Sequence, residues 1–346
     1  MIPVQNIYYM LAYAFKALDV KDFRHLATEQ FDNVADLCAA ILITGISGQL
    51  KRGLHHDYIE RTEALSSPRG RLHLSDSIKT GSLPKKQLVC SFDEFSVDSY
   101  TNRILKTAMT QLLATDIARS RKKAIRKLLM FFGDVQLLKP SRIRWNLRYN
   151  RNNQTYRLLI AVCYLVLNSL LQTQMDGSKR LMDFFDEQNM SRLYEKFILE
   201  YFRREFPHLN ARASQISWAL DNDSSEMLPI MQTDVTLSLA DRILIIDAKY
   251  YSHTMQERWG KHTLHSGNLY QIFTYVKNKA ACDSTAKIDG MLLYARTTED
   301  QQPDQKYSMS GNTISVRTLD LNCSFPKIAA GLDRIAEEYF GSALAA

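Results

Sequence analysis

The chain has 346 residues, of which 45% are hydrophobic and 23% charged, and its formal net charge is +7 at pH 7. This composition is typical of a globular protein with one large domain or two ordinary ones. Its five scattered cysteines form no CxxC pair, which argues against a disulfide framework and a zinc ribbon and favours a reducing cytoplasm.

The first predicted element is a helix over residues 7–15, for which Asn6 is a suitable N-cap. This apolar stretch lacks the basic region and the small-residue cleavage site of a signal peptide, so we expect a buried helix. A second helix is predicted over residues 34–53. No run reaches the ~18 apolar residues that a membrane span requires, and we therefore expect no membrane partner.

Residues 55–98 show strand-like alternation interrupted by Pro, Gly and Ser, which predicts short strands and turns. Within this region "SPRGRL" contains a Pro-Arg-Gly turn that would present Arg69 and Arg71 as exposed cations. Helical periodicity then returns over residues 99–132 and 155–172, and a polar stretch that we interpret as a linker or exposed loop follows.

The positive charge is concentrated in one part of the chain. Between residues 119 and 157 there are twelve basic residues and one acidic residue, so this segment carries +11 and the remainder −4. Such a block is expected of a surface that binds a polyanion such as DNA, although a solvated helix face has the same appearance. The residues at i, i+3, i+4 and i+7 on one predicted helix face are Arg119, Lys122, Lys123 and Arg126.

The second half of the chain alternates between helices and strands. The order of these elements predicts an α/β fold with a mixed sheet flanked by helices. We expect helices at 190–206, 267–279 and 325–340, and strands at 213–220, 229–239, 242–251, 290–296 and 313–321.

Two of these strands carry charged residues in an otherwise apolar pattern. If Ala240 and Asp241 form a two-residue turn, Asp234 falls directly opposite Asp247, with the Cβ atoms ~5 Å apart. Carboxylates so close need a cation or a shared proton, and their oxygens suit Mg²⁺. Lys249 would then stabilise negative charge on a phosphate. This arrangement predicts a metal-dependent phosphodiesterase, while the alternative is a surface ion pair of little energetic value.

The order of helix, Asp strand, Asp-Ala-Lys strand and Gln-bearing helix resembles the PD-(D/E)xK nuclease superfamily. Longer stretches, among them "IPVQNIYYMLAYAF", "SPRGRLHLSDSI", "FSVDSYTNRILK", "LYEKFILEYFRRE" and "SGNLYQIFTYV", are similar to the McrC family, the nuclease subunits of McrBC modification-dependent restriction systems. The resemblance spans nearly the whole chain in the same order. One departure is that Pro229 lies five residues before Asp234 and not beside it.

The resemblance implies that Asp234 and Asp247 hold Mg²⁺ and that Lys249 is the catalytic lysine. Glu195 stands where many relatives carry a helix acid near the metal, and it borders the apolar stripe of its helix, whereas Glu200 points away and is expected to be solvated.

Gln271 and Tyr275 are similar to the Gln-X₃-Tyr helix motif of the superfamily, which places Gln271 among the catalytic residues. The alternative is structural, with Asn268 capping this helix and Gln271 at its N3 position. The preceding loop "GKHTLHSGN" lacks a third zinc ligand, so we expect it to lie beside DNA, with Lys261 contacting a phosphate.

McrC-like proteins work with McrB, a hexameric AAA+ GTPase, and stimulate its GTP hydrolysis. The resemblance therefore implies two domains: an adaptor over residues 1–185 that binds the GTPase, through Arg69 or Arg71, and an endonuclease over residues 186–346. The sequence has no P-loop motif of its own. We expect a Mg²⁺-dependent endonuclease, active on methylcytosine DNA mainly in complex. The alternatives are a non-catalytic GTPase activator or DNA-holding module, and a stand-alone repair nuclease.

Overall fold

The computed structural model describes residues 2–16, 23, 25–26, 28–149, 155–176, 187–221, 225–251, 253–258 and 261–344. The chain divides into two compact units. Unit 1 comprises Met1–Phe31 and Phe185–Ala346, and unit 2 comprises Asp32–Phe184.

Unit 1 is built on a five-stranded mixed sheet with the order β11-β12-β10-β7-β6. The three central strands run parallel, and β6 and β11 are antiparallel to their neighbours. The mixed sheet expected from the sequence is therefore confirmed. Its strands are β6 (Val235–Leu239), β7 (Arg242–Lys249), β10 (Lys287–Ala295), β11 (Gln305–Met309) and β12 (Asn312–Leu319).

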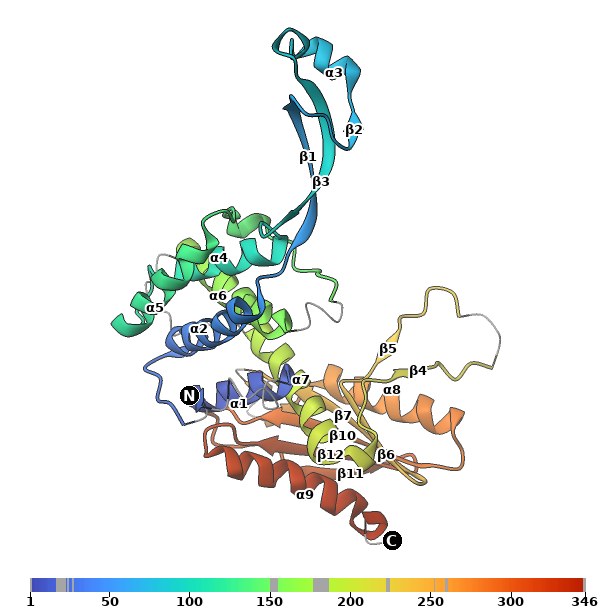
Figure 1. Cartoon of the computed structure of the whole chain (residues 1–346). Coiled ribbons are helices and arrows are strands. Elements are labelled where there is room, and N and C mark those ends of the chain that lie inside the picture. Colours follow the sequence, from blue (N-terminus) through green and yellow to red (C-terminus); the bar gives the residue numbers. More distant parts are fainter. Residues whose placement is uncertain are drawn as a thin grey trace. The chain divides into compact units, whose positions relative to one another are not determined.

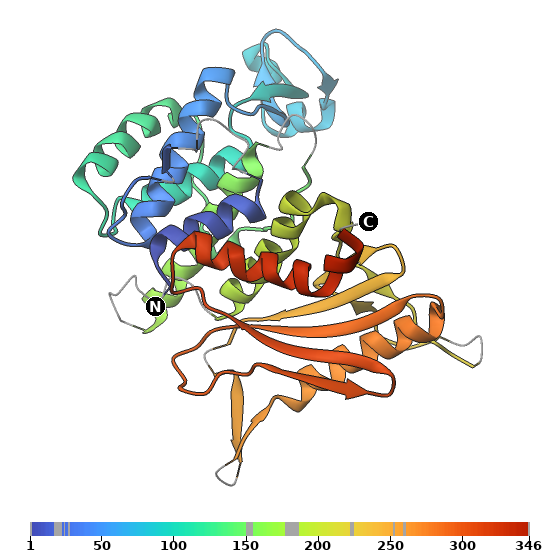
Figure 2. The ribbon, with the colours of Figure 1, turned by 90° about the horizontal axis from the view of Figure 1, so that it is seen from below.

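Two helices cover the two faces of this sheet, α8 (Ser266–Cys282) on one and α9 (Phe325–Leu344) on the other (Figure 2). Alternate side chains of each strand point to opposite faces of the sheet, and therefore toward different helices. Ile243 and Ile245 of β7 share a buried cluster with Ile272 of α8, so they face that helix. A third helix, α7 (Glu187–Glu205), packs against β7.

Unit 1 also carries two small β-ribbons, β4 (Gln215–Ile216) with β5 (Met231–Gln232), and β8 (Met255–Arg258) with β9 (Lys261–Leu264). The strand predicted over residues 213–220 is thus reduced to two residues, because β4 pairs only with the two residues of β5. The unit is completed by the short 3₁₀ helix η7 (Pro207–Leu209).

The first helix, α1 (Val4–Ala14), belongs to unit 1 and packs against α7. The predicted boundary of an adaptor over residues 1–185 is therefore wrong for the first 31 residues. Pro3, and not Asn6, is the N-cap of α1. The side chain of Asn6 has a different partner: its Nδ2 donates to the carbonyls of Leu321 and Cys323 at 2.9 and 2.7 Å. This buried amide ties the beginning of the chain to the segment before α9.

The helical part of unit 2 contains α2 (Val34–Arg52), α4 (Tyr100–Leu112), α5 (Arg119–Leu129) and α6 (Tyr156–Asp176), with the 3₁₀ turns η4 (Met130–Phe132) and η5 (Pro140–Arg142). Asn33 caps α2 by accepting a hydrogen bond from the Asp36 amide at 2.9 Å. Gly45 allows α6 to approach closely, since a Cβ there would lie 2.3 Å from Leu159 Cδ2.

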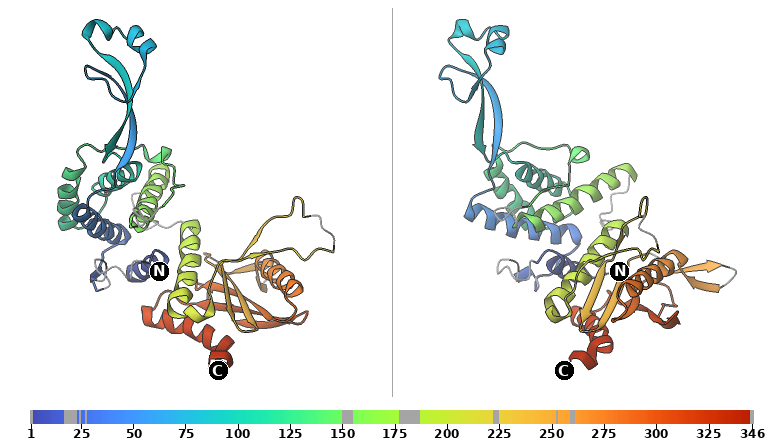
Figure 3. Two further views of the ribbon diagram at one scale, coloured as in Figure 1. Left: turned by 45° about the vertical axis from the view of Figure 1, so that its right-hand side comes forward. Right: turned by 90° about the vertical axis from the view of Figure 1, so that its right-hand side faces the viewer.

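A long antiparallel arm extends from these helices within unit 2 (Figures 1 and 3). It consists of β1 (Asp57–Leu65), β2 (Arg71–Leu72) and β3 (Leu88–Ser96), with helix α3 (Leu74–Lys79) and the turn η3 (Leu83–Lys85) at its tip. The strands and turns predicted here are confirmed, while the short helix was not expected. Most of β1 is exposed, whereas Val89, Cys90 and Phe92 of β3 are buried. Backbone pairing between the strands and a small buried cluster on β3 therefore hold the arm together.

Among the described residues, α2 is long and apolar enough to cross a membrane, contrary to the expectation from the sequence. However, 61% of its apolar window is buried within the protein. Such burial is what a core helix of a globular unit shows, and it gives only weak support to a membrane span.

Candidate functional site

The β6–β7 hairpin brings the two aspartates together. Leu239 pairs with Arg242 and Val235 with Ile246, which is the predicted register with a two-residue turn. Ala240 in the turn has φ of 50°, as this tight geometry requires. Continuing the register by one residue places Asp234 opposite Asp247.

Both carboxyl groups lie in a poorly solvated environment. Asp247 is only 1% exposed, and Asp234 Oδ2 accepts a hydrogen bond from the Ala248 amide at 2.8 Å. Burial, together with the charges of Asp247 and Glu195, raises the pKa of Asp234 to about 8. Burial also raises the pKa of Asp247, although the charge of Lys249 opposes this rise. Two close carboxyls therefore retain a proton unless a cation neutralises them.

Lys249 ends β7 and completes the cluster. Its Nζ lies 2.8 Å from Asp247 Oδ2 and donates to Gln271 Oε1 at 3.2 Å. Burial by itself would lower the pKa of Lys249, but the charges of Asp247 and Asp234 outweigh it, and the pKa is raised. The lysine is consequently held as an ammonium group at neutral pH.

Gln271 positions this ammonium group through a short relay. Its Nε2 donates to the Tyr275 hydroxyl at 2.9 Å, which in turn donates to the Gln232 carbonyl at 3.1 Å. The amide oxygen of Gln271 is thereby turned toward Lys249. The Gln-X₃-Tyr pair predicted from the sequence thus contacts the carboxylate cluster through the lysine.

The capping alternative for Gln271 is wrong. The N-cap of α8 is His265, and Asn268 lies inside the first turn. The Asn268 side chain instead donates to the Tyr294 hydroxyl at 3.0 Å and accepts from the Tyr251 hydroxyl at 3.2 Å. The Asn268 amide therefore links α8 to the sheet and does not cap the helix, and Gln271 is free to bind the lysine.

Glu195 on α7 borders the same cluster. Burial raises the pKa of Glu195, the charge of Lys249 lowers it and the charge of Asp247 raises it. The charge of Glu195 in turn raises the pKa of Asp234, so the three acids interact electrostatically. Glu195 Oε1 accepts a hydrogen bond from Ser191 Oγ at 3.0 Å. Within the described ranges, no three His, Cys, Asp or Glu side chains lie close enough to hold one metal ion. A metal role for Glu195 stays a prediction.

The expectation that Glu200 is solvated is wrong. This residue is 8% exposed, accepts a hydrogen bond from Arg203 Nη1 at 2.7 Å and lies 3.4 Å from Lys16 Nζ. The reason is that α1 belongs to unit 1, so that Lys16, just after it, pairs with this side of α7.

The Asp234–Asp247 pair fits a hard divalent ion. Asp247 Oδ2 is buried and makes no hydrogen bond of good geometry with the described part of the chain, although Lys249 Nζ lies close to it. A buried oxygen without a hydrogen bond costs free energy, and a second carboxyl group faces it. Carboxylate oxygens of this kind are the ligands that Mg²⁺ prefers. The donor set therefore suits Mg²⁺ bound by one or two carboxylates.

The predicted partner-binding residues lie on the arm of unit 2. Arg69 and Arg71 are exposed on either side of Gly70, and the guanidinium of Arg69 stacks 3.7 Å from the centre of the Phe92 ring. Gly70 has φ of +70°, and a Cβ there would lie 2.3 Å from the Ser91 carbonyl oxygen. The predicted Pro-Arg-Gly turn is confirmed, and only glycine fits its last position.

The basic residues of α5 point mainly to solvent. Lys123 and Arg126 are exposed and Lys122 is partly so, whereas Ile125 and Leu128 are buried inside unit 2. Arg121 is an exception within the basic block. Its Nε forms an ion pair with the buried Asp36 at 2.8 Å, so this arginine stabilises the packing of α5 on α2.

The predicted loop lysine, Lys261, begins strand β9, and its side chain lies outside the described part of the structure.

Sequence reasoning missed a group of exposed apolar side chains near the tip of the arm. They are unusual because large apolar residues on an isolated element normally pack against something. The sequence did offer one indication of this exposure, because these apolar residues lie in a polar, turn-rich segment. These residues are Leu72, Leu74, Ile78 and Leu83.

Comparison with known proteins gives consistent matches. Residues 4–295 match the family described as McrBC 5-methylcytosine restriction system component. The chain is 31% identical over 346 residues to the type IV methyl-directed restriction enzyme EcoKMcrBC of Escherichia coli (strain K12), covering 98% of each chain. Its fold resembles a chain in the refined half-complex from a tetradecameric assembly of Thermococcus gammatolerans McrB AAA+ hexamers with bound McrC. The TM-score is 0.51 at 18% identity, over 96% of this chain and 76% of that one.

Proposed function

Because the chain belongs to the family of McrBC 5-methylcytosine restriction system components, we propose that it is the DNA endonuclease subunit of such a system. The observation that carries this proposal is the buried pair of Asp234 and Asp247 with Lys249 beside it. A structural ion pair needs one acid for one lysine. A second buried acid is costly without a cation, and a metal-dependent phosphodiesterase is the function that uses it.

Each member of the cluster has a chemical role in phosphodiester hydrolysis. Asp234 and Asp247 would hold Mg²⁺, which supplies Lewis-acid chemistry to a phosphate oxygen. Lys249 places a positive charge where negative charge grows on the phosphate in the transition state. Gln271 holds the lysine by a hydrogen bond that does not depend on Asp247. The lysine therefore keeps its position when the charge of Asp247 is neutralised.

The test of this role uses Asp247→Ala in the reconstituted complex with a GTPase partner, Mg²⁺, GTP and 5-methylcytosine DNA. We expect cleavage to be lost while assembly and stimulation of GTP hydrolysis are retained, because Asp247 lies in unit 1 and the arm in unit 2. Calorimetry on the variant controls for misfolding. Cleavage at the wild-type rate by the variant would show that the metal site is wrongly assigned.

The rival function, a non-catalytic GTPase activator or DNA-holding module, gives a different result in the same assay. In that case the wild-type complex stimulates GTP hydrolysis but cuts no DNA. A stand-alone repair nuclease would instead degrade plasmid DNA with Mg²⁺ alone. We expect the isolated chain to do neither reaction efficiently, and a cytoplasmic complex to be its working form.

We further propose that the partner is an McrB-like AAA+ GTPase hexamer, bound through the arm of unit 2. In the T. gammatolerans assembly, McrC is bound to McrB AAA+ hexamers. The arm of this chain supports the same role by its exposure, its apolar tip and the two cations Arg69 and Arg71. An exposed patch of this kind is typical of a protein–protein contact.

This contact is tested with the double variant Arg69→Ala and Arg71→Ala. The matched control is Lys51→Ala with Arg52→Ala, two exposed cations of unit 2 at the end of α2. We expect the arm variant alone to weaken binding of the GTPase in sedimentation or light scattering, with unchanged thermal stability. Equal binding by the two variants would exclude these arginines from the interface.

The basic face of α5 and the β8–β9 ribbon are proposed to contact DNA. Lys122, Lys123 and Arg126 would meet phosphates from unit 2, and Lys261 from unit 1. Exposed cations along one helix face bind polyanions without reading sequence, which suits a nuclease subunit that relies on a partner to recognise the modified base.

A further inference from the structure

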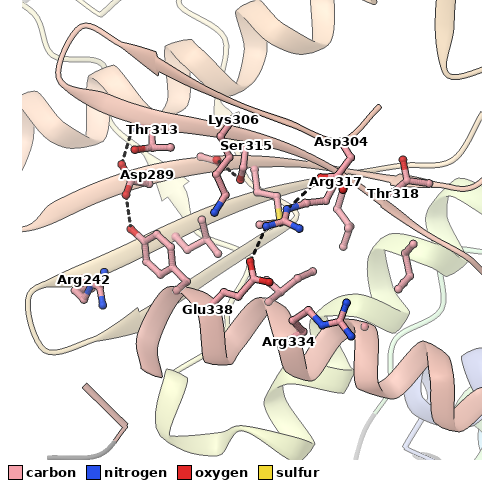
Figure 4. A pocket seen from close by; sticks show the side chains of 18 of the residues that line it. Arg242, Asp289, Asp304, Lys306, Thr313, Ser315, Arg317, Thr318, Arg334 and Glu338 are labelled. Atoms are coloured by element: carbon pink, nitrogen blue, oxygen red, sulfur yellow. Dashed lines mark hydrogen bonds and ion pairs between the residues drawn. The ribbon is translucent and has the colours of Figure 1, made fainter. Parts of the chain in front are cut away.

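A second polar site lies in unit 1, between α9 and the sheet. A pocket of about 390 Å³ opens there, with side chains from β7, β10, β11, β12 and α9 pointing into it (Figure 4). Its volume falls within the range of about 300–1,000 Å³ that is typical of small-molecule sites.

This pocket is separate from the carboxylate cluster because it uses the opposite face of the sheet. On β10 and β12, Leu292 and Val316 belong to the apolar cluster that packs on α8. The alternate residues Asp289 and Ser315 line the pocket on the α9 side. On β7 the same alternation places Leu244 in the pocket, while Asp247 shares the face of Ile245.

The lining is strongly charged, although a sheet face covered by a helix is normally apolar. Five cations and three acids surround the pocket, so it carries two net positive charges. The cations are Arg242, Lys287, Lys306, Arg317 and Arg334, and the acids are Asp289, Asp304 and Glu338.

The three acids are already engaged with groups of the protein. Arg317 Nη2 pairs with Glu338 at 2.6 Å, and its Nε lies 3.5 Å from Asp304. Asp289 accepts hydrogen bonds from the Thr313 amide at 2.7 Å and from the Tyr339 hydroxyl at 3.1 Å. No acid of the pocket therefore remains for the other cations.

Three cations that line the pocket have no partner among the residues that the structure describes. The side chains of Lys287, Lys306 and Arg334 make no hydrogen bond or ion pair within the part of the chain that the structure describes. Lys306 extends from β11 toward α9, and Arg334 stands on α9 itself (Figure 4). In addition, the buried Nε of Arg317 faces Asp304 only at 3.5 Å and makes no hydrogen bond with the described residues.

We propose that this pocket binds a phosphate group. Lysine ammonium and arginine guanidinium groups that converge on one cavity are the donors that phosphate oxygens prefer. The apolar side chains of Leu244, Met291 and Ile335 would contact the remainder of a phosphorylated ligand. The phosphate belongs either to a free small molecule or to a DNA backbone that passes outside α9, and both present the same chemistry to the cations.

The proposal is tested by titrating the full-length chain in EDTA, so that metal binding and cleavage play no part. The first probe is inorganic pyrophosphate, whose binding is measured by calorimetry. The second is a DNA duplex of about 20 base pairs, whose binding is measured by fluorescence anisotropy at several salt concentrations. The pocket variants are Arg334→Glu and Lys306→Glu. The matched control is Lys327→Glu, an exposed cation of α9 outside the pocket that undergoes the same change of charge.

We expect each pocket variant to weaken binding of one probe by about tenfold or more, the effect of losing roughly one charge-assisted hydrogen bond. The control should change it much less. A loss confined to pyrophosphate identifies a free phosphorylated ligand as the source. A loss confined to the duplex, with a flatter salt dependence, identifies the DNA backbone. Equal effects of Arg334→Glu, Lys306→Glu and Lys327→Glu on both probes, or no binding of either probe, would overturn the proposal.

Discussion

Replacing Asp234 by Asn is the most direct physical test of the carboxylate cluster. Asn has the same shape and can still accept the hydrogen bond from the Ala248 amide, but it carries no charge at any pH. The change therefore removes the repulsion between Asp234 and Asp247 and little else. We expect a protein that is more stable without metal and inactive with it.

The magnitude follows from the pKa of Asp234, which rises from 3.8 to about 8 on folding. One pKa unit corresponds to about 1.4 kcal/mol, so a rise of roughly 4 units sets a limit of the order of 5 kcal/mol on the cost of the ionised group. Lys249 and relaxation of the hairpin reduce it. We expect the variant to gain about 1 to 4 kcal/mol in the free energy of unfolding at pH 7 in EDTA, or several degrees in the unfolding temperature.

The sign of the pH dependence is fixed by the same shift. A carboxyl group whose pKa is raised on folding favours the folded state at low pH, and this contribution is lost as pH rises through the folded pKa. The stability of the wild-type chain should therefore fall relative to the variant between about pH 4 and pH 8. If the ionised pair binds Mg²⁺ as proposed, the stabilising effect of Mg²⁺ on the wild type should grow over the same range.

The assay is calorimetry from pH 5 to pH 8, with EDTA or with Mg²⁺, followed on the transition of unit 1. The matched control is Asp241→Asn, an exposed carboxylate in the turn of the same hairpin, which should leave stability and its response to Mg²⁺ unchanged. A variant at Asp234 that is less stable than the wild type in EDTA at pH 8 would refute the reasoning. So would one that Mg²⁺ stabilises as much as it stabilises the wild type.

Three other changes probe separate parts of the molecule. Gln271→Ala should lower kcat by about tenfold to a hundredfold with little effect on Mg²⁺ affinity, because it frees Lys249 without touching the carboxylates; an unchanged kcat would remove the relay from catalysis. Lys123→Glu with Arg126→Glu should weaken DNA binding and flatten its salt dependence by roughly 0.9 per lost contact, and an unchanged slope in anisotropy titrations would leave the GTPase as the partner of α5. Gly70→Ala should destabilise the arm, detected as faster hydrogen exchange in β3, because the new Cβ meets the Ser91 carbonyl; wild-type protection would argue against the turn geometry.

The β6–β7 hairpin could be predicted from the sequence because its geometry is local. Alternation of side chains and a two-residue turn fix the register, and the register alone places Asp234 opposite Asp247. The same holds for the turn at Gly70 and for the solvent-facing side of α5. In each case a few consecutive residues and their backbone preferences determine the outcome.

Other features depend on contacts between residues far apart in the chain, which no local pattern specifies. Asn6 reaches carbonyls more than 300 positions away, and so α1 joins unit 1 and not unit 2. Whether Gln271 serves as a helix cap or as the partner of Lys249 was decided by how α8 packs on the sheet.

The pocket beneath α9 likewise became visible only when four strands and a helix were brought together. The sequence by itself determined which residues could form the carboxylate cluster, because strand register is a short-range property. Only the tertiary structure decided which charges are buried, paired or left without a partner, because burial and pairing are set by long-range packing.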